Sequence, residues 1–507
     1  MPTYLSEEVE ATAAELQRLS DQVARLQRTP PSYAERMKRL NQFGRMVSEN
    51  WGAIGAALQQ DLNCNDPTPH LSVPLRELEF MLANLSSLMQ SVSVSSEISL
   101  VNFPASAELV PHPVGPVLIL GTWNYPFHST WGPVPGALAA GNSVVIKPGS
   151  LAKASSAVMA QLATNYFDSA VLVCVEGGVE AVTPLLNEFR WGHIFFTGGT
   201  NIGKIVMTAA AKRLVPVTLE LGGKSPCIVT ASADIPLAAR RIAWGKWASN
   251  AGQVCVAPDH VLVHASVAEA LIGELEKCVH QFFPSQPKAD PNFARIISTG
   301  HARRLEQILQ TDHIHLHPLT PDSPSIGDKF IPPSLLDFGE DWQAFAASAS
   351  MAGEIFGPIL PVVRFAKIHT LQDYLSSLEN SPLALYVFSR DSAAAVRSLS
   401  DLLPSGAIVV NDCGIHIVES ALPFGGVGAS GMGQYHGKRT FDLFTHYRPT
   451  LWKSGWMDIP MRYPPAGVWS TRVVGFLLWL ARKRVTPIRI GKWLLVLGLV
   501  YRILRRP

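Results

Sequence analysis

The fold is decided at Val215-Pro216-Val217-Thr218-Leu219-Glu220-Leu221-Gly222-Gly223-Lys224, where two α/β halves of the chain meet. The first six residues are mostly apolar and end in a carboxylate, and the glycine pair then breaks the pattern. We expect this break to leave the Glu220 carboxylate at the mouth of a strand. Short apolar runs alternate with helical segments on both sides, which is typical of doubly wound parallel sheets.

The alternation predicts the elements of each half. Before the junction we expect strands at 117–120, 143–146, 170–175 and 194–196, with helices at 151–166 and 202–211. After it we expect strands at 227–229, 260–263, 361–365, 384–388 and 407–411, with helices at 236–250, 267–282 and 370–378. Further expectations are helices within 6–62 and at 74–92, an exposed ribbon at 98–114 and a loop at 312–328.

A candidate nucleophile, Cys255, lies in the second half, in the run Asn250-Ala251-Gly252-Gln253-Val254-Cys255-Val256-Ala257-Pro258. We expect the preceding Gly252-Gln253 pair to be small and flexible, so that a substrate can approach closely. A thiol nucleophile with a separate carboxylate base, here Glu220, is a workable acyl-transfer pair. The alternative is that Cys255 is a small buried hydrophobe, as most lone cysteines are.

The other cysteines and the N-terminus bear on the cellular compartment. The six cysteines are scattered without CxxC or zinc-like spacing, and residues 1–27 hold no apolar signal-peptide core. We therefore expect a reducing, intracellular compartment and no metal site.

A glycine-rich run, Gly426-Val427-Gly428-Ala429-Ser430-Gly431, matches the dinucleotide-binding pattern in its letters alone. It does not follow a predicted strand, and Gly433 and Gly437 would break the helix that should come next. We interpret it as a loop that packs near the active site.

Ordered motifs between Trp123 and Arg448 make the assignment more specific. They are Trp123-Asn124-Tyr125-Pro126, Lys147-Pro148, Phe196-Thr197-Gly198, Glu220 to Pro226, Gly252 to Asp259, Glu354-Ile355-Phe356-Gly357-Pro358, and Leu422-Pro423-Phe424-Gly425-Gly426. Together they resemble the aldehyde dehydrogenase superfamily, and the ending Tyr435-His436-Gly437-Lys438 resembles its class 3, fatty-aldehyde branch.

The resemblance implies the catalytic roles. Cys255 would attack the aldehyde carbonyl as a thiolate, and the Asn124 amide with the Cys255 N–H would stabilise the oxyanion. Glu220 would activate the water that hydrolyses the thioester. The alternatives are an Asx-type turn before Pro126 for Asn124 and a helix-capping carboxylate for Glu220.

The resemblance also implies a cofactor, NAD or NADP. Lys147 would meet the adenosine ribose, Gly198 and Gly199 the pyrophosphate, Glu354 the nicotinamide ribose, and Phe356 the nicotinamide. The remaining cofactor-binding positions that it implies are Trp123, Ser150, Gly203 and Leu221. Two departures bear on cofactor preference. Gly149-Ser150 replaces the family's Ser-Glu, which removes a carboxylate that favours a free 2′-hydroxyl, and Gly199 stands where many relatives have Ser or Asn.

The implied fold is aldehyde dehydrogenase-like, with two doubly wound α/β domains and a small β oligomerisation ribbon. We expect these parts in chain order: N-terminal helices and the first part of the cofactor domain at 1–97, the ribbon at 98–114, the cofactor domain at 115–220, the catalytic domain at 221–413, a return segment at 414–449 and a basic-hydrophobic tail at 450–507.

The expected reaction is oxidation of apolar, medium- to long-chain aldehydes to acids by a homodimer. Two alternatives stay open: a catalytically idle structural or binding protein on the same fold, and an acylating enzyme in which coenzyme A resolves the thioester. Intact Cys255, Glu220 and Asn124 disfavour the first alternative, and Glu220 disfavours the second.

Charge is concentrated in the tail. Although the whole chain carries only +2, residues 450–507 hold eleven Lys or Arg and one Asp, so the tail carries +10 and the remainder −8. Two apolar runs, 473–481 and 493–501, are each shorter than the roughly 20 residues that a membrane-spanning helix needs. Short apolar runs with tryptophan beside clustered cations are typical of an interfacial anchor on an anionic, cytosol-facing leaflet. We therefore expect a membrane surface, of the endoplasmic reticulum or another organelle, as the partner, and no nucleic acid. The alternative is a C-terminal helix packed on the protein itself.

Truncation tests the anchor. Removing 450–507 should release the protein from anionic vesicles, because each nearby Lys or Arg contributes about 1 kcal/mol of surface attraction and the apolar runs add to it. Activity on a short, soluble aldehyde should persist, whereas activity on membrane-dissolved long-chain aldehydes should fall. Vesicle flotation of full-length and truncated protein measures the effect, and equal behaviour of the two would favour a tail folded onto the enzyme.

Overall fold

The computed structural model describes residues 30–64, 66–94, 105–378, 380–456 and 463–464. The chain divides into two units: Met1–Ser86 with Pro113–Thr445, and Ser87–His112 with His446–Pro507. The predicted helical segment at 6–29, residues 98–104 of the predicted ribbon at 98–114, and nearly all of the tail lie outside the described residues.

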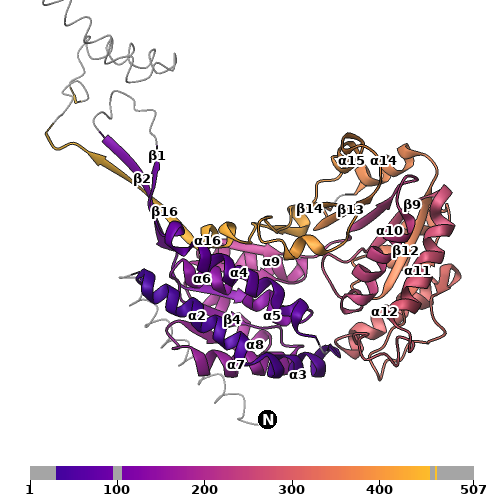
Figure 1. Cartoon of the computed structure of the whole chain (residues 1–507), viewed down its shortest axis with the longest axis horizontal. Helices are drawn as coiled ribbons and strands as arrows, with labels where there is room; N and C mark the ends of the chain where they lie inside the picture. Colours follow the sequence, from indigo (N-terminus) through magenta and orange to yellow (C-terminus); the bar gives the residue numbers. More distant parts are fainter. Residues whose placement is uncertain (1–29, 65, 95–104, 379, 457–462, 465–507) are drawn as a thin grey trace, which may run out of the picture. The chain divides into compact units, whose positions relative to one another are not determined.

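The first unit, shown in Figure 1, contains a six-stranded sheet that includes the strands predicted for the first half of the chain. Its order is β15-β7-β6-β3-β4-β5, and all neighbours are parallel except β15 with β7. The strands are β3 (Val117–Leu120), β4 (Val144–Lys147), β5 (Leu172–Cys174), β6 (His193–Thr197), β7 (Val217–Glu220) and β15 (Gly431–Met432). The predicted strands and their parallel arrangement are therefore confirmed.

The helices associated with this sheet include α7 and α9, which were predicted from the sequence. They are α2 (Tyr33–Glu49), α3 (Trp51–Leu62), α4 (Thr68–Leu88), α5 (Pro126–Trp131), α6 (Val134–Ala139), α7 (Lys153–Tyr166), α8 (Val179–Asn187), α9 (Thr200–Ala211) and α16 (Lys438–Leu443). Apolar residues of β3, β6 and β7 form one buried core with α8 and α9. This packing is the usual way in which a parallel sheet loses its solvent-exposed faces.

A seven-stranded sheet forms the other part of this unit. Its order is β10-β11-β12-β9-β8-β13-β14, and only β10 runs antiparallel to its neighbour. The strands are β8 (Pro226–Val229), β9 (His260–His264), β10 (Leu316–Pro318), β11 (Ser334–Asp337), β12 (Ile359–Phe365), β13 (Ala384–Phe388) and β14 (Ala407–Val410). The associated helices are α10 (Ile235–Ala243), α11 (Ala268–Phe282), α12 (Thr299–Thr311), α13 (Trp342–Ala347), α14 (Ile368–Ser377) and α15 (Ala393–Ser400).

Three sequence expectations were wrong in detail. The predicted loop at 312–328 contains β10, whose three residues are too few to give a strand pattern. The predicted helix at 236–250 is α-helical only to Ala243 and continues as a π-helix, Trp244–Ala248. The predicted helix at 74–92 begins earlier, at Thr68, and ends at Leu88, after which β1 (Val92–Val94) starts.

The glycine-rich run lies beside the junction rather than at a dinucleotide turn. Gly431 and Met432 pair antiparallel with Glu220 and Leu219 of β7, and Leu221 N–H donates to Ser430 O at 3.0 Å. This placement agrees with the interpretation of the run as a loop near the candidate active site.

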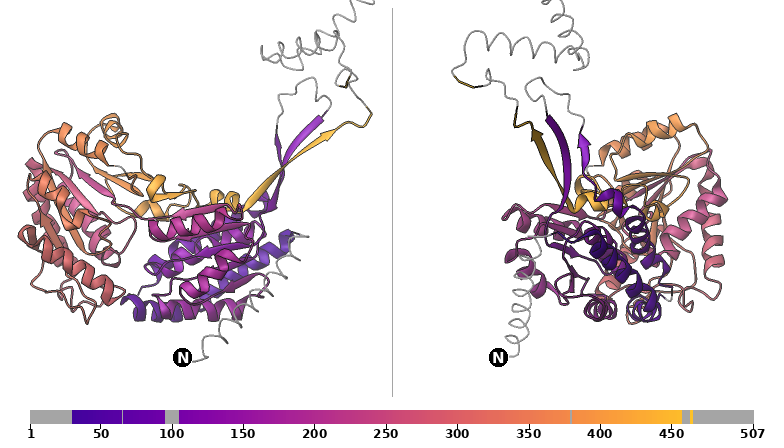
Figure 2. Two further views of the ribbon diagram at one scale, coloured as in Figure 1. Left: turned by 180° about the vertical axis from the view of Figure 1, so that it is seen from behind. Right: turned by 60° about the vertical axis from the view of Figure 1, so that its left-hand side comes forward.

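The second unit holds a three-stranded antiparallel ribbon (Figure 2). Its strands are β1, β2 (Ala105–Pro113) and β16 (Thr445–Lys453), with β2 in the centre. Trp452 Nε1 donates to Glu108 Oε1 at 2.7 Å across the ribbon. Among the described residues, no helix is long and apolar enough to cross a membrane.

A buried carboxylate caps α7 from outside that helix. Asp61, at the end of α3, accepts the N–H groups of Ala154 at 3.1 Å and Ser155 at 2.8 Å. These are two of the four N–H groups that a helix leaves without an internal partner at its start. Asp61 therefore joins α3 to α7.

Removing this cap should destabilise the protein. Asp61→Ala should lower the free energy of unfolding by about 1–3 kcal/mol, because a lost cap and unsatisfied buried donors both contribute. Asp61→Asn should cost less, since the amide oxygen can still accept one N–H. Urea unfolding checks this, and equal stability of Asp61→Ala and the unsubstituted protein would contradict it.

Candidate active site

Glu220 is the last residue of β7 and is 4% exposed. Gly198 N–H donates to its backbone carbonyl at 3.0 Å, whereas neither carboxylate oxygen has a hydrogen-bond partner among the described residues. Burial therefore raises the pKa of Glu220 well above its usual value. Because it accepts no hydrogen bond from the described residues, the Glu220 carboxylate does not cap a helix, which was the alternative role. A buried, unpaired carboxyl group is costly to stability and is frequent at sites that transfer protons.

The segment before Cys255 has an unusual backbone. Asn250, Ala251 and Gly252 follow the π-helix with φ angles of 49°, 49° and 75°. A Cβ added at Gly252 would lie 2.3 Å from Gly357 O, so only glycine fits there. Cys255 itself is half-buried, and its surroundings raise the pKa of its thiol to about 12, through burial first and then through Glu354 and Glu220.

Gln253 is rigidly held, which corrects the expectation of a flexible Gly252-Gln253 pair. Its side chain is fully buried, its Oε1 accepts Ile297 N–H at 3.1 Å and its Nε2 donates to Arg295 O at 3.0 Å. No sequence pattern indicates this role, because the partners lie more than 40 residues further along the chain.

Asn124 is fixed to the same segment. Its Nδ2 donates to Gln253 O at 2.8 Å, and Asn250 Nδ2 donates to Asn124 O at 2.9 Å. This pair of bonds ties the turn after β3 to the segment that ends at Cys255. The amide is therefore oriented by a distant segment rather than by a local Asx turn.

A cavity of about 370 Å³ brings the three predicted catalytic residues together. Cys255, Glu220 and Asn124 all line it. Much of the remaining wall is apolar or aromatic and includes Tyr125, Trp244, Ile415, Ile417, Val418 and Phe424. His70 and His128 also line it, and His70 stacks on Tyr125 with ring centroids 4.6 Å apart. The sequence patterns identified none of these wall residues, because they come from several distant segments.

The start of α9 has the features of a phosphate site. Gly199 is its N-cap, no side chain of the described residues caps this end, and a Cβ added at Gly199 would meet no described atom within 4 Å. Free N–H groups at a helix start attract anions such as a pyrophosphate. Gly203 packs so closely on Leu221 that an added Cβ would lie 2.7 Å from its Cδ2.

Lys147 and Ser150 follow β4. Lys147 is buried, its Nζ donates to Pro148 O at 2.8 Å, and burial lowers its pKa. Ser150 is exposed. Gly149 allows the chain to pass against the Thr122–Trp123 backbone, since an added Cβ would lie 2.7 Å from Trp123 N.

Glu354 and Phe356 lie in the loop before β12. A Cβ added at Gly222 would lie 2.2 Å from Glu354 Oε2, and burial, followed by Asp259, raises the pKa of Glu354 to about 8. Phe356 has a φ of 50° and contacts Trp123 edge-on, with centroids 5.4 Å apart. The glycine cradle at Gly222 and the uncapped start of α9 fit a dinucleotide. The described residues contain no group of three His, Cys, Asp or Glu side chains that could hold a metal ion.

A fold of two α/β sheets with a thiol, an amide and a buried carboxyl group on one cavity defines a class, and comparison with known proteins agrees with it. The aldehyde dehydrogenase family model matches residues 7–449, and the chain belongs to this family of NAD- or NADP-dependent oxidoreductases that act on the aldehyde group.

Particular relatives are similar over most of their length. Rat aldehyde dehydrogenase family 3 member A2 is 40% identical over 435 residues, which cover 85% of this chain and 87% of the relative. The rat dimeric NADP-preferring aldehyde dehydrogenase is 39% identical, over 85% and 93% of the two chains. The substrate-bound structure of Staphylococcus aureus AldH aligns with a TM-score of 0.85 at 34% identity, over 92% of this chain and 99% of that one.

The burial of Glu220 predicts a pH-dependent stability. The folded protein keeps the Glu220 proton at pH values where the unfolded chain, with a pKa near 4.5, has lost it. The folded state therefore binds more protons, and this group lowers stability as pH rises above that value. Glu220→Gln, which cannot ionise, should be more stable than the unsubstituted protein at pH 8, and the difference should shrink at pH 5.

Thermal unfolding at the two pH values measures this difference. Glu77→Gln is a matched control, because Glu77 is also buried but accepts Gly437 N–H at 2.7 Å and the Thr440 hydroxyl at 2.6 Å. Its substitution should lower the midpoint. A Glu220→Gln variant that is less stable at pH 8 would show that the carboxylate has a structural partner.

Proposed function

We propose that the protein oxidises apolar, medium- to long-chain aldehydes to carboxylic acids with NAD or NADP, through a covalent adduct on Cys255. The observation that carries this proposal is that Cys255, Asn124 and the unpaired Glu220 line one cavity. An idle binding protein has no chemical need to bury an unpaired carboxyl group beside a thiol.

Cys255 is the nucleophile. As a thiolate, its sulfur forms a bond to the aldehyde carbon, and the electron pair of the C=O π bond moves to the carbonyl oxygen, which becomes an oxyanion. Asn124 Nδ2 and the Cys255 N–H are the donors for that oxygen, and removal of one such donor typically costs about 3–4 kcal/mol of barrier. Because the bonds to Gln253 and Asn250 hold Asn124 in place, the amide needs little reorganisation during the reaction.

The start of α9, Lys147, Glu354 and Phe356 would hold the cofactor. When bound, the nicotinamide supplies the hydride acceptor that conversion of the thiohemiacetal to a thioester requires. Ser150 offers no carboxylate against a 2′-phosphate, so both NAD and NADP are compatible with this site.

Glu220 activates the water that releases the acid. Its raised pKa means that the ionised form is a stronger base than an exposed glutamate, and efficient bases have a pKa near the working pH. Water rather than coenzyme A therefore resolves the thioester in this proposal.

The cavity and the tail support the substrate class. The largely apolar wall suits an alkyl chain, and residues 450–507 would keep the enzyme on a cytosol-facing membrane surface, where such aldehydes dissolve. We also propose a homodimer assembled through the ribbon, since the rat NADP-preferring relative is described as dimeric. The domain boundaries at 97, 114, 220, 413 and 449 remain part of this proposal.

Two substitutions test the chemistry. Cys255→Ala should abolish aldehyde-dependent reduction of the cofactor while cofactor binding stays nearly intact, because the thiol acts on the aldehyde only. Glu220→Gln should slow thioester hydrolysis more than hydride transfer, so a pre-steady-state burst of reduced cofactor should appear or grow.

Stopped-flow absorbance of the reduced cofactor measures both effects. Substantial turnover by Cys255→Ala would exclude the thiol as nucleophile. Equal losses of burst and steady-state rate in Glu220→Gln would assign Glu220 a structural role, and a burst restored to full turnover by coenzyme A would favour the acylating alternative.

A further inference from the structure

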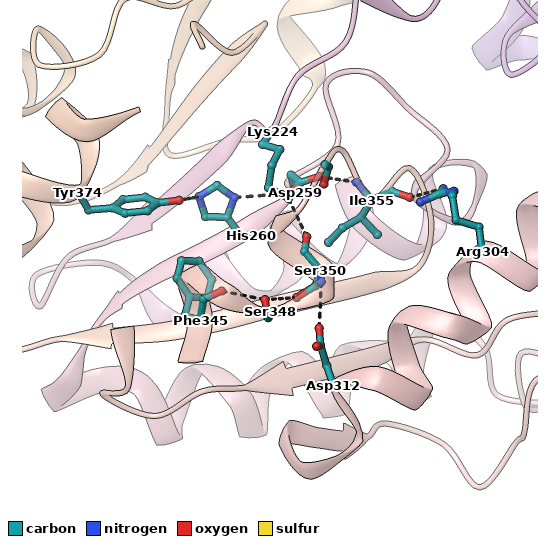
Figure 3. A network of polar contacts seen from close by, with 11 residues as sticks. Lys224, Asp259, His260, Arg304, Asp312, Phe345, Ser348, Ser350, Ile355 and Tyr374 are labelled. Carbon is teal, nitrogen blue, oxygen red and sulfur yellow. Dashed lines mark hydrogen bonds and ion pairs between the residues drawn. The ribbon is translucent and has the colours of Figure 1, made fainter. Parts of the chain in front are cut away.

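A single buried carboxylate, Asp259, connects three segments of the candidate site (Figure 3). It lies four residues after Cys255 and is 3% exposed. Its Oδ2 accepts Lys224 Nζ at 2.5 Å, and its Oδ1 accepts Ile355 N–H at 3.0 Å. Asp259 thereby links the segment after Cys255, the segment after Glu220 and the loop that carries Glu354 and Phe356.

The backbone is held on both sides of Glu354. Before it, Gly353 O accepts Lys224 Nζ at 2.9 Å. After it, the Ile355 N–H is held by Asp259 and the Ile355 carbonyl accepts Arg304 Nη2 at 2.6 Å. Lys224 also donates to Ser350 O at 2.9 Å, earlier in the same loop. The position of Glu354 relative to Cys255 therefore depends on the Lys224–Asp259 pair.

The charges around Asp259 support an ionised carboxylate. Burial would raise the pKa of Asp259, but Lys224, His260 and Lys246 together hold it below its usual range. His260 Nδ1 lies 3.5 Å from Asp259 Oδ2, and its Nε2 lies 3.1 Å from the Tyr374 hydroxyl (Figure 3). If Tyr374 donates to Nε2, the imidazole proton is on Nδ1 and faces Asp259. The carboxylate is thus approached by donors from three sides.

We propose that Asp259 is a positioning residue that, with Lys224, holds Glu354 and Phe356 in register with Cys255 for cofactor binding and hydride transfer. It contacts neither the candidate substrate cavity nor the cofactor positions directly, and it acts through the backbone around Glu354. This inference rests on the proposed function, because it assigns the Glu354 loop to the cofactor.

The test separates cofactor-dependent from cofactor-independent chemistry of the same thiol. Aldehyde oxidation needs both Cys255 and the cofactor, whereas hydrolysis of p-nitrophenyl acetate needs only attack by Cys255 and release by water. Asp259→Asn should raise the KM for NAD and lower the dehydrogenase kcat by a combined factor of about 10–100, the size that small misplacements of reacting groups produce. Ester hydrolysis should stay close to that of the unsubstituted enzyme.

A second variant approaches the same pair from its other side. Lys224→Met should reproduce the loss, and the double variant should lose little more than either single one, since both remove one interaction. The Lys224 side chain is 20% exposed, so this variant keeps the test open if Asp259→Asn does not fold.

The matched control is Asp61→Asn. Asp61 is also a buried carboxylate, but it accepts two backbone N–H groups and caps α7. It should lower the unfolding midpoint without changing the ratio of dehydrogenase to esterase activity. Parallel losses of both activities in Asp259→Asn would overturn the inference, because they would show a general support of the Cys255 segment. An Asp259→Asn variant whose KM for NAD and dehydrogenase kcat match those of the unsubstituted enzyme would overturn it as well.

Failure of the proposed function would look different. An unsubstituted enzyme that reduces no NAD with any aldehyde would refute the proposed function. The dissociation constants of NAD for the unsubstituted protein and Asp259→Asn, from fluorescence titration, would still test the positioning role: weaker binding by the variant supports it and equal binding overturns it.

Discussion

The close backbone approach at Leu221-Gly222-Gly223 is the constraint on which the site depends. Leu221 packs on Gly203 at the start of α9, and Gly222 leaves room for the Glu354 carboxylate. A side chain at Gly222 would displace that carboxylate, since its Cβ would lie within 3 Å of three carboxylate atoms. The linker between β7 and β8 therefore sets the distance between the two sheets' functional loops. Glu220 directly precedes this linker and Lys224 directly follows it, so the linker also determines where these two side chains lie.

Much of the fold was predictable because the buried parallel strands read as short apolar runs. Strands β3, β6, β8 and β13 were each predicted within a residue or two, because a parallel strand covered by helices on both faces has a nearly continuous apolar sequence. The pairing of Cys255 with Glu220 was suggested by the residues themselves, whereas the role of Asn124 beside them was implied only by the family resemblance. The spacing of these residues along the chain does not predict that they lie close together.

What could not be predicted depends on contacts between distant segments. The π-helix at Trp244–Ala248 lies in a sequence that reads as an ordinary helix, and the left-handed Asn250 and Ala251 have no sequence signal. Gln253 was read as flexible, yet its side chain bonds residues 295 and 297. Local propensity describes neighbours along the chain, whereas these bonds join segments that only the tertiary fold places side by side.

The site concentrates buried charge that the remainder of the fold must tolerate. Lys246 is 1% exposed, and burial lowers its pKa to about 8 despite the opposing effects of Asp259 and Glu354. Glu220 and Glu354 have raised pKa values for the same reason. By contrast, Asp259 and Lys224 in this region form an ion pair. The Lys224–Asp259 ion pair, together with the hydrogen bond from Ile355 N–H to Asp259, holds the backbone beside Glu354 in place next to these groups. A site that must move protons near a fixed cofactor needs both kinds of group. Here Glu220 and Lys224 are four residues apart on one segment, and Glu354 directly precedes Ile355, whose N–H donates to Asp259.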